Sequence, residues 1–259
     1  NPDVCAFPPL RVRFNEATDT LFEGQPPLKL VTHCQDNDGF DQIILKEHLV
    51  YQTYLQLTDR GHRVRLVRIS YQENGNQRTT RYGFFLEDWR AVAERNDLIA
   101  ESIDGGVNID RLSVDDMNRV AVFQYMIGND DWSALWPEPD EDCCHNVQPL
   151  IDAEGRVVPL PYDFDFARIV NPPYAITKGM YSNTVSRRYG GLCLTQGNLQ
   201  EALELFRERR DLIYSVFRNE AALNPRHLRF SLIALDRFYD TINNPNRVER
   251  RMVEKCQSS

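Results

Sequence analysis

The chain has 259 residues, 42% of them hydrophobic and 26% charged, a composition typical of a folded globular protein with one large domain or two lobes. Its net charge of −8 at pH 7 and pI near 5.2 argue against a nucleic-acid-binding protein, which normally presents a basic face. No membrane span is expected, because the longest apolar run, at 119–128, is only about half of the roughly 18 residues required and predicts a core helix instead.

The first ninety residues are predicted to be rich in strands, with one helix. Alternating and β-branched residues predict strands at 11–14, 28–34, 63–72 and 81–88, the last two joined by the turn ENGNQ. Between the second and third of these strands, residues 41–59 carry apolar side chains at helical spacing, and Asp41 is the expected N-cap.

From residue 89 the pattern becomes mainly helical. We expect a short helix or linker at 89–97 and helices at 113–130, 199–219 and 225–242, followed by a tail. The segments HNVQPLI (145–151) and VVPLPYDFD (157–165), joined by the turn DAEG, predict a second hairpin. The sequence therefore predicts an α+β fold whose character changes near residue 90.

The six cysteines, at positions 5, 34, 143, 144, 193 and 256, form no CxxC motif, so a thiolate zinc site is not expected. Cys5 and Cys34 could join an N-terminal segment to a strand in an oxidising compartment, although cytosolic free thiols fit almost as well. Cys143-Cys144 is interpreted as one disulfide end beside one free thiol. The chain starts at Asn1 without an initiator Met, and its compartment stays open, with export to the periplasm or extracellular space favoured.

The stretch PLPYDFDF (159–166) places two carboxylates inside an apolar and aromatic run. Alternate residues of a strand point the same way, so Asp163 and Asp165 are expected to face one side. Two like charges so close raise each other's pKa and are costly to bury. A shared divalent cation, commonly Mg²⁺, would relieve this cost, as would Arg or backbone donors. A solvated turn after the strand is the alternative.

Three segments carry the other candidate groups: GNDDWS (128–133), CHNV (144–147) and YDFD (162–165). The predicted hairpin sets Asn146 and Asp163 near opposite ends of paired strands, where their oxygens can hold a divalent cation. Asp131, from the preceding loop, can accept a proton from a substrate hydroxyl. Kinase catalytic segments have this order: a carboxylate that acts as the catalytic base, then a metal-binding Asn, then a metal-binding Asp after a hairpin.

These segments resemble those of atypical protein-kinase-like families, in particular the CotH spore-coat kinases and, more distantly, the HipA-type kinases. The families carry N-x-D, then Asn before apolar residues, then D-h-D after an apolar pair. This chain has Asn129-Asp130-Asp131, His145-Asn146-Val147 and Asp163-Phe164-Asp165 at the corresponding places. A strand Lys, the Glu of LKEHL and the strand ending in YGFFLED extend the resemblance over residues 25–170.

The resemblance implies a two-lobed protein-kinase-like fold, with a strand-rich nucleotide-binding lobe at 1–90 and a helical lobe at 91–259. It implies ATP with Mg²⁺ or Mn²⁺ as cofactors and phosphoryl transfer to a hydroxyl of a protein or small molecule. The implied roles are phosphate contact for Lys29, pairing with that lysine for Glu47, a hinge position beside the adenine for Glu87, catalytic base for Asp131, and metal binding for Asn146 and Asp163 with Asp165 in support.

Two other functions stay open. No Gly-rich loop precedes Lys29, where the chain offers only FEGQPP, and this departure favours a catalytically inactive, kinase-like binding module. A metal-dependent hydrolase would instead use Asp130, Asp131, His145, Asp163 and Asp165 around one or two ions.

The segment between Asp131 and Asn146 must loop out, because these residues stand fifteen apart, wider than in a usual catalytic loop. Its acids could form a surface for a basic substrate. Trp132 and Trp136 are expected to pack in the interior, although an exposed Trp here could stack on a substrate. Arg187-Arg188 could reach an anionic substrate or simply belong to a mobile loop.

Overall fold

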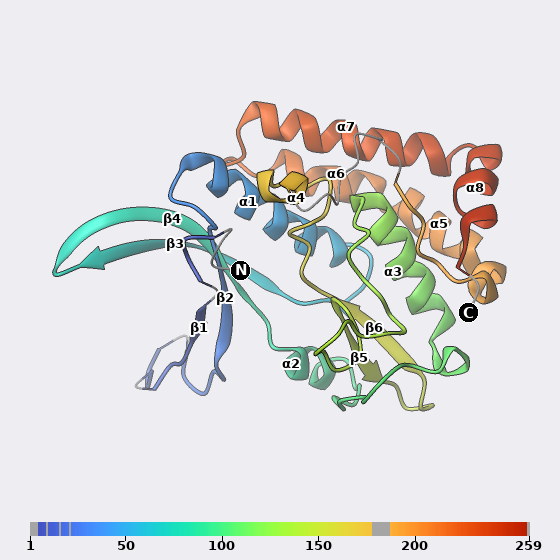
Figure 1. The fold of residues 1–259 in the computed structure, drawn as a ribbon, viewed down its shortest axis with the longest axis horizontal. Helices are drawn as coiled ribbons and strands as arrows, with labels where there is room; N and C mark the ends of the chain where they lie inside the picture. Colours follow the sequence, from blue (N-terminus) through green and yellow to red (C-terminus); the bar gives the residue numbers. More distant parts are fainter. Residues whose placement is uncertain (1–4, 9, 16, 21, 178–186, 258–259) are drawn as a thin grey trace.

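The structure, a computed structural model, describes all residues except 1–4, 9, 16, 21, 178–186 and 258–259 (Figure 1). It is a mixed α+β fold, 40% helical and 18% strand, with a small antiparallel sheet and several helices. The predicted α+β class is therefore confirmed. Within the described ranges, no helix combines the length and the hydropathy that crossing a membrane requires.

The antiparallel sheet consists of β1 (Leu10–Val12), β2 (Leu28–Thr32), β3 (Val64–Glu73) and β4 (Asn76–Leu86), in the order β1-β2-β4-β3. The β3–β4 hairpin extends away from the helices at the left of Figure 1. It turns at Asn74-Gly75, where both residues have positive φ angles of 51° and 77°, as a tight hairpin turn requires. Lys29 pairs with Leu86, which places the lysine beside the end of β4.

Helix α1 (Asp38–Tyr54) packs on one face of this sheet, where the fully buried Phe84 meets it. The expected N-cap, Asp41, is wrong. Asn37 has extended backbone and its side chain accepts hydrogen bonds from the N–H groups of the first turn, so the helix begins three residues earlier. Asp41 accepts instead from the Tyr82 N–H at 2.9 Å and thereby ties the helix to β4.

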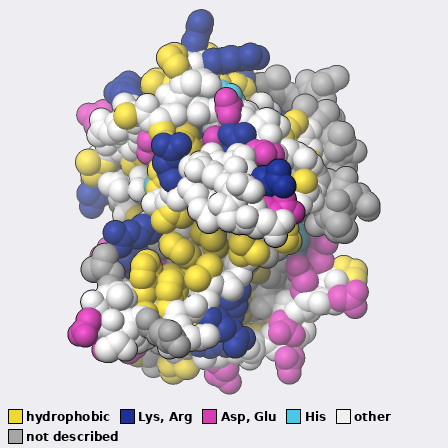
Figure 2. Space-filling view, turned by 90° about the vertical axis from the view of Figure 1, so that its left-hand side faces the viewer, with side chains coloured by type: hydrophobic (Ala, Val, Ile, Leu, Met, Phe, Trp, Pro, Cys, Tyr) yellow, Lys and Arg dark blue, Asp and Glu magenta, His cyan; other side chains and the backbone are white. Residues whose placement is uncertain are grey.

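The opposite face of the sheet carries an aromatic cluster of Phe14, Phe22 and Phe85. The Phe14 and Phe22 rings stack with centroids 4.4 Å apart, and both approach Phe85 edge-on. Figure 2 looks along the β3–β4 hairpin and shows hydrophobic side chains gathered below it, with Lys and Arg side chains beside them. This face therefore exposes more apolar surface than the face that α1 covers.

The remaining helices are α2 (Trp89–Glu94), α3 (Val114–Ile127), α4 (Pro173–Thr177), α5 (Leu199–Glu208), α6 (Arg210–Arg218), α7 (Pro225–Ile242) and α8 (Pro245–Arg251), with 3-10 turns η1 (Ile109–Arg111), η2 (Cys193–Asn198) and η3 (Val253–Lys255). The core-helix prediction holds, because α3 buries eleven of its residues. The single helix predicted at 199–219 is wrong: it divides at Arg209, whose ψ angle of 2° leaves the helical range. The predicted tail contains α8.

The second hairpin, β5 (Val147–Ile151) and β6 (Val157–Pro161), is confirmed. The strand was expected to include the two acids, and this is wrong, because pairing stops at Pro161. Asp163 has a left-handed backbone with φ 58°, which a strand cannot contain. Phe164, fully buried, separates the two acids and anchors the turn in the core.

Three disulfide bonds join Cys5 to Cys34, Cys143 to Cys144, and Cys193 to Cys256, and the part of the chain described has no free cysteine. Of the two alternatives left open for Cys5 and Cys34, the structure contains the disulfide bond. The interpretation of Cys143-Cys144 as a disulfide end beside a free thiol is wrong, because the two neighbours bond to each other.

Candidate functional site

A cavity of about 480 Å³ lies between the sheet, α1 and the segment that follows β6. Four of the predicted site residues line it: Lys29 from β2, Glu47 from α1, and Asp163 and Asp165 from the turn after β6. The rest of the wall is largely apolar and includes Val31, Phe40, Ile43, Ile44 and residues 5–8. Residues from four separate parts of the chain therefore converge on one cavity.

Lys29 and Asp163 form the ion pair at the mouth of this cavity. Lys29 Nζ lies 3.9 Å from Asp163 Oδ2, and the two side chains are 39% and 40% exposed, so solvent screens their attraction. The Asp163 N–H donates a hydrogen bond to the Tyr51 hydroxyl at 2.9 Å, which fixes the left-handed turn to α1. The Lys29–Asp163 ion pair is therefore weak, whereas the backbone of Asp163 is fixed by its hydrogen bond to Tyr51.

Glu47 and Asp165 lie deeper in the cavity. Burial, reinforced by repulsion from Asp165 and Asp163, raises the pKa of Glu47, which is only 3% exposed, well above its usual range. Burial and the neighbouring Asp163 likewise raise the pKa of Asp165 to about 7, although a hydrogen bond from the Tyr174 hydroxyl, at 3.1 Å, opposes the shift. Three carboxyl groups thus lie near one lysine, and a bound cation would favour their ionised forms.

The residues of the cavity suit Mg²⁺ by their chemistry. Carboxylate and amide oxygens are hard ligands, and Mg²⁺ is usually held by one or two carboxylates together with substrate phosphates, without an all-protein cage. Among the described residues, no three or more His, Cys, Asp or Glu side chains are grouped so that they could hold a metal ion.

A second cluster surrounds Asp131. Asn146 Nδ2 donates to the Asp131 carbonyl oxygen at 2.7 Å and to its Oδ2 at 3.2 Å, so residues fifteen apart in sequence are in contact. His145 Nε2 lies 3.1 Å from Asp131 Oδ1, and its Nδ1 lies 2.9 Å from Glu141 Oε2. Burial alone would lower the pKa of His145, but the hydrogen bonds to Glu141 and Asp131 outweigh it and raise the pKa. The segment between Asp131 and Asn146 loops out, as expected.

The two clusters adjoin each other. The Tyr162 N–H donates to the Asn146 carbonyl at 3.0 Å, at the point where β5 and β6 meet the turn that carries Asp163. The Asp131 charge also contributes to the raised pKa of Asp165, as groups close together in a poorly solvated region do. Asp131 and the acidic end of the cavity therefore lie close together.

Glu87 is placed differently from the other predicted residues. It follows β4 directly and lies next to the residue that pairs with Lys29. Its carboxylate accepts from the Arg63 N–H at 2.8 Å and from Arg95 Nε at 2.9 Å, and the cavity wall does not include it. The structure thus gives Glu87 a role in holding the end of β4, and does not bring its side chain to the other site residues.

Asp130 also points away from the cluster around Asp131. Its Oδ2 lies 3.9 Å from Arg168 Nη2, and burial raises its pKa even though Arg168 and Arg188 oppose this. The hydrolase arrangement, in which Asp130 joins Asp131 and His145, is not assembled in this geometry.

Two tyrosines that contact the site residues were not identified from the sequence. Tyr51 stands four residues after Glu47 on α1, and this spacing, which places two side chains on one helix face, was a usable signal. Tyr174 lies in α4 (Pro173–Thr177), which was not predicted, and no pattern pointed to it. Both hydroxyls hold the acidic turn in place.

Comparisons with the models of known protein families and with curated proteins found no match to this chain. What can be said of function therefore rests on the geometry of the site.

Proposed function

We propose that this protein is an ATP- and divalent-metal-dependent phosphotransferase with a two-lobed, kinase-like arrangement, acting on a hydroxyl of a protein or small molecule. The observation that carries the proposal is the convergence of Lys29, Glu47, Asp163 and Asp165 on one cavity, with Asp131 and Asn146 beside it. A basic group, a buried acid and paired carboxylates in one cavity are what a phosphate-and-metal ligand requires.

Within this proposal, Lys29 binds the nucleotide phosphates and Glu47 is the acid that pairs with it in the bound state, whereas in this structure the ion pair of Lys29 is with Asp163. The apolar wall, including Val31 and Ile44, excludes water around the bound nucleotide. Mg²⁺ or Mn²⁺ held by Asp163, with Asn146 and Asp165, would supply the positive charge that neutralises the phosphates.

Asp131 is the proton acceptor for the attacking hydroxyl. Its carboxylate is oriented by Asn146 and by His145, which fixes it before substrate binds. Phosphoryl transfer asks little covalent chemistry of the protein, so positioning and charge stabilisation supply most of the rate.

The direct test measures the melting temperature with ATP, with Mg²⁺ or Mn²⁺, and with both. A ligand that binds only the native state raises the melting temperature, by about 5–10 °C when its concentration is roughly 100 times Kd. We expect the rise to need both ligands and to vanish in Asp163→Ala. The matched control is Asp211→Ala, because the Asp211 side chain is 96% exposed on α6 and remote in sequence from the cavity residues.

A rise with metal alone, retained without nucleotide, would instead favour the hydrolase. No rise with any combination, in protein that unfolds cooperatively, would favour a kinase-like binding module. The absence of a Gly-rich loop before Lys29 is the observation on which this second candidate depends.

A further inference from the structure

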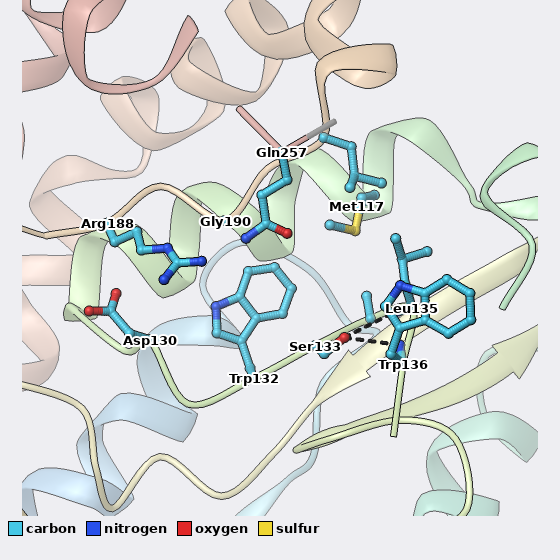
Figure 3. Close-up of a pocket in the computed structure, with 11 residues that line it drawn as sticks. Met117, Asp130, Trp132, Ser133, Leu135, Trp136, Arg188, Gly190 and Gln257 are labelled. Carbon is cyan, nitrogen blue, oxygen red and sulfur yellow. Dashed lines mark hydrogen bonds between the residues drawn. The ribbon is translucent and has the colours of Figure 1, made fainter. Parts of the chain in front are cut away.

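A second, smaller cavity of about 140 Å³ lies beside Asp131 and is not used by the proposed reaction. One wall is the loop 130–136, which contributes Asp130, Trp132 and Trp136. The other wall consists of Arg188, Gly190 and Gln257 (Figure 3). Figure 3 shows the Arg188 and Gln257 side chains approaching the Trp132 ring, with Trp136 on the far side of Ser133.

Both walls are held in place by hydrogen bonds. The Leu135 and Trp136 N–H groups donate to Ser133 Oγ at 3.3 and 3.0 Å. On the opposite wall, the Gln257 N–H donates to the Gly191 carbonyl at 2.8 Å, next to the disulfide between Cys193 and Cys256. A pocket whose walls are fixed in advance loses little conformational entropy when a ligand binds.

Trp136 is the group in this pocket whose exposure calls for an explanation. This residue is 65% exposed, at the rim of a cavity that includes the polar side chains of Asp130, Arg188 and Gln257 as well as apolar ones. Both indoles pack on a glycine: a Cβ at Gly190 would lie 2.8 Å from the Trp132 ring, and a Cβ at Gly106 would lie 2.5 Å from the Trp136 ring. Both rings are thus held in position, and Trp136 still presents most of its surface to a ligand.

The charges of the pocket narrow the class of ligand. Asp130 lies 3.9 Å from Arg168, and Arg188 adds a second positive charge beside it. These two arginines already offset the negative charge of Asp130, so the pocket attracts a cationic ligand only weakly. Asp130 would in turn repel an anion. A purely apolar ligand would leave Arg188 and Gln257 without hydrogen-bond partners, which is costly when water is displaced.

A neutral polyhydroxylated ring satisfies all of these groups. Its hydroxyls can accept from Arg188, donate to Asp130 and do both with Gln257, and its C–H face can lie on an indole, whose ring face is electrostatically negative. We infer that this pocket, between Trp132, Trp136, Arg188 and Gln257, is a binding site for one sugar ring of a carbohydrate ligand.

The test is a titration of tryptophan fluorescence with a panel of neutral tetrasaccharides, namely cellotetraose, maltotetraose, mannotetraose and chitotetraose, without nucleotide. The chain has three tryptophans, and the third, Trp89, lies under Arg90 and packs on a separate cluster. We expect saturable quenching by at least one sugar, weakened at least about tenfold in Trp136→Ala and in Gln257→Ala. Trp89→Phe is the control and should leave the apparent Kd unchanged.

Because Trp136 and Gln257 are both exposed, these variants should fold, and an unchanged unfolding transition verifies this. The inference is overturned if no sugar of the panel changes the fluorescence at concentrations up to about 10 mM, where even a weak single-ring site is occupied. It is also overturned if Trp136→Ala is quenched with the same apparent Kd as wild type, or if tetralysine quenches in place of the sugars. Since the titration contains no ATP, its result and that of the phosphotransferase test are independent.

Discussion

Asp165 is the residue whose chemistry depends most on its surroundings. It lies in a turn, yet its carboxyl reaches the deep end of the cavity beside Asp163 and accepts from Tyr174. Burial and the neighbouring carboxylate oppose ionisation, whereas an exposed Asp would ionise freely. A bound cation would favour the ionised form of Asp165. Without a cation, ionisation of this buried carboxyl lowers the stability of the folded protein.

This cost predicts how Asp165→Asn changes stability. The pKa of Asp165 rises from the ordinary 3.8 to about 7 in the folded protein, so the folded state keeps its proton to higher pH than the unfolded state. Wild type therefore loses stability as pH rises from about 4 to about 7, whereas Asn does not titrate. We expect Asp165→Asn to match wild type near pH 4 and to exceed it by roughly 1–3 kcal/mol at pH 8.

Urea denaturation of metal-free protein between pH 4 and pH 8 measures this difference. Asn keeps an oxygen that can accept from Tyr174, so the packing of the turn is preserved. Asp211→Asn, at an exposed position, is the control and should show no gain that grows with pH. An equal gain at pH 4 and pH 8 would show that ionisation is not the cause.

At the scale of single residues, the hairpin could be predicted, and with it the positions of Asn146 and Asp163 beside its paired ends, because Val147 pairs with Pro161. The contact of Asn146 with Asp131 comes from the loop before the hairpin and was not predicted. The sequence could not show that His145 would bridge Asp131 and Glu141. That contact depends on how the intervening loop folds back, which no local pattern encodes.

Among the elements, the junction between β4 and α1 determines where Glu47 lies. Arg81 of β4 reaches three acids at the start of α1: its Nε lies 2.7 Å from Asp36, and its Nη1 lies 2.7 Å from Asp38 and 3.3 Å from Asp41. The Arg81 side chain is 15% exposed, whereas those of Asp36 and Asp38 are 48% and 97% exposed, so the guanidinium is better shielded from solvent than these two acids. A single guanidinium thus anchors the helix that carries one wall of the cavity.

We expect Arg81→Gln to lower the free energy of unfolding by about 1 kcal/mol, because three acids lose a shared partner and repel one another. Arg78→Gln is the matched control on the same strand: its partner is Glu73, and both side chains are more than 60% exposed, so no measurable change is expected. Urea denaturation measures both. Equal effects of the two substitutions would contradict the anchoring role.

Elements with strong local signals were predicted correctly, and those decided by tertiary contacts were not. The second hairpin and α7 were predictable because turn residues and helical spacing mark them. The start of α1 was misplaced because Asn37 and Asp41 are both acceptable caps in sequence, and the contact of Asp41 with Tyr82 of β4 decided between them.

At the scale of the whole molecule, two of the disulfides, Cys5–Cys34 and Cys193–Cys256, join residues that are far apart in the sequence. Cys193 and Cys256 are separated by 63 residues, whereas Cys143 and Cys144 are neighbours. A bond that closes a long loop restricts the unfolded chain far more than one between neighbours. Disulfide bonds of this kind form and persist in oxidising environments.

We therefore expect the double variant Cys193→Ser/Cys256→Ser to lose about 2–4 kcal/mol of stability. Cys143→Ser/Cys144→Ser is the matched control and should lose much less. Denaturation under non-reducing conditions measures both, and a thiol assay on unfolded wild type should find no free thiol. A larger loss from the neighbouring pair, or a free thiol in wild type, would contradict this pairing.

The bond between Cys193 and Cys256 also makes α5 to α8 a closed covalent ring. A protease that cuts once inside the ring opens it without releasing a fragment, so until a reductant is added the nicked and intact forms differ in mass only by the water that hydrolysis adds. Gln257 follows the ring directly and stays attached to Cys256. A nicked molecule would thus keep both sides of the tryptophan-lined pocket in one disulfide-linked molecule. Opening of the ring and loss of the pocket can therefore be observed as separate events.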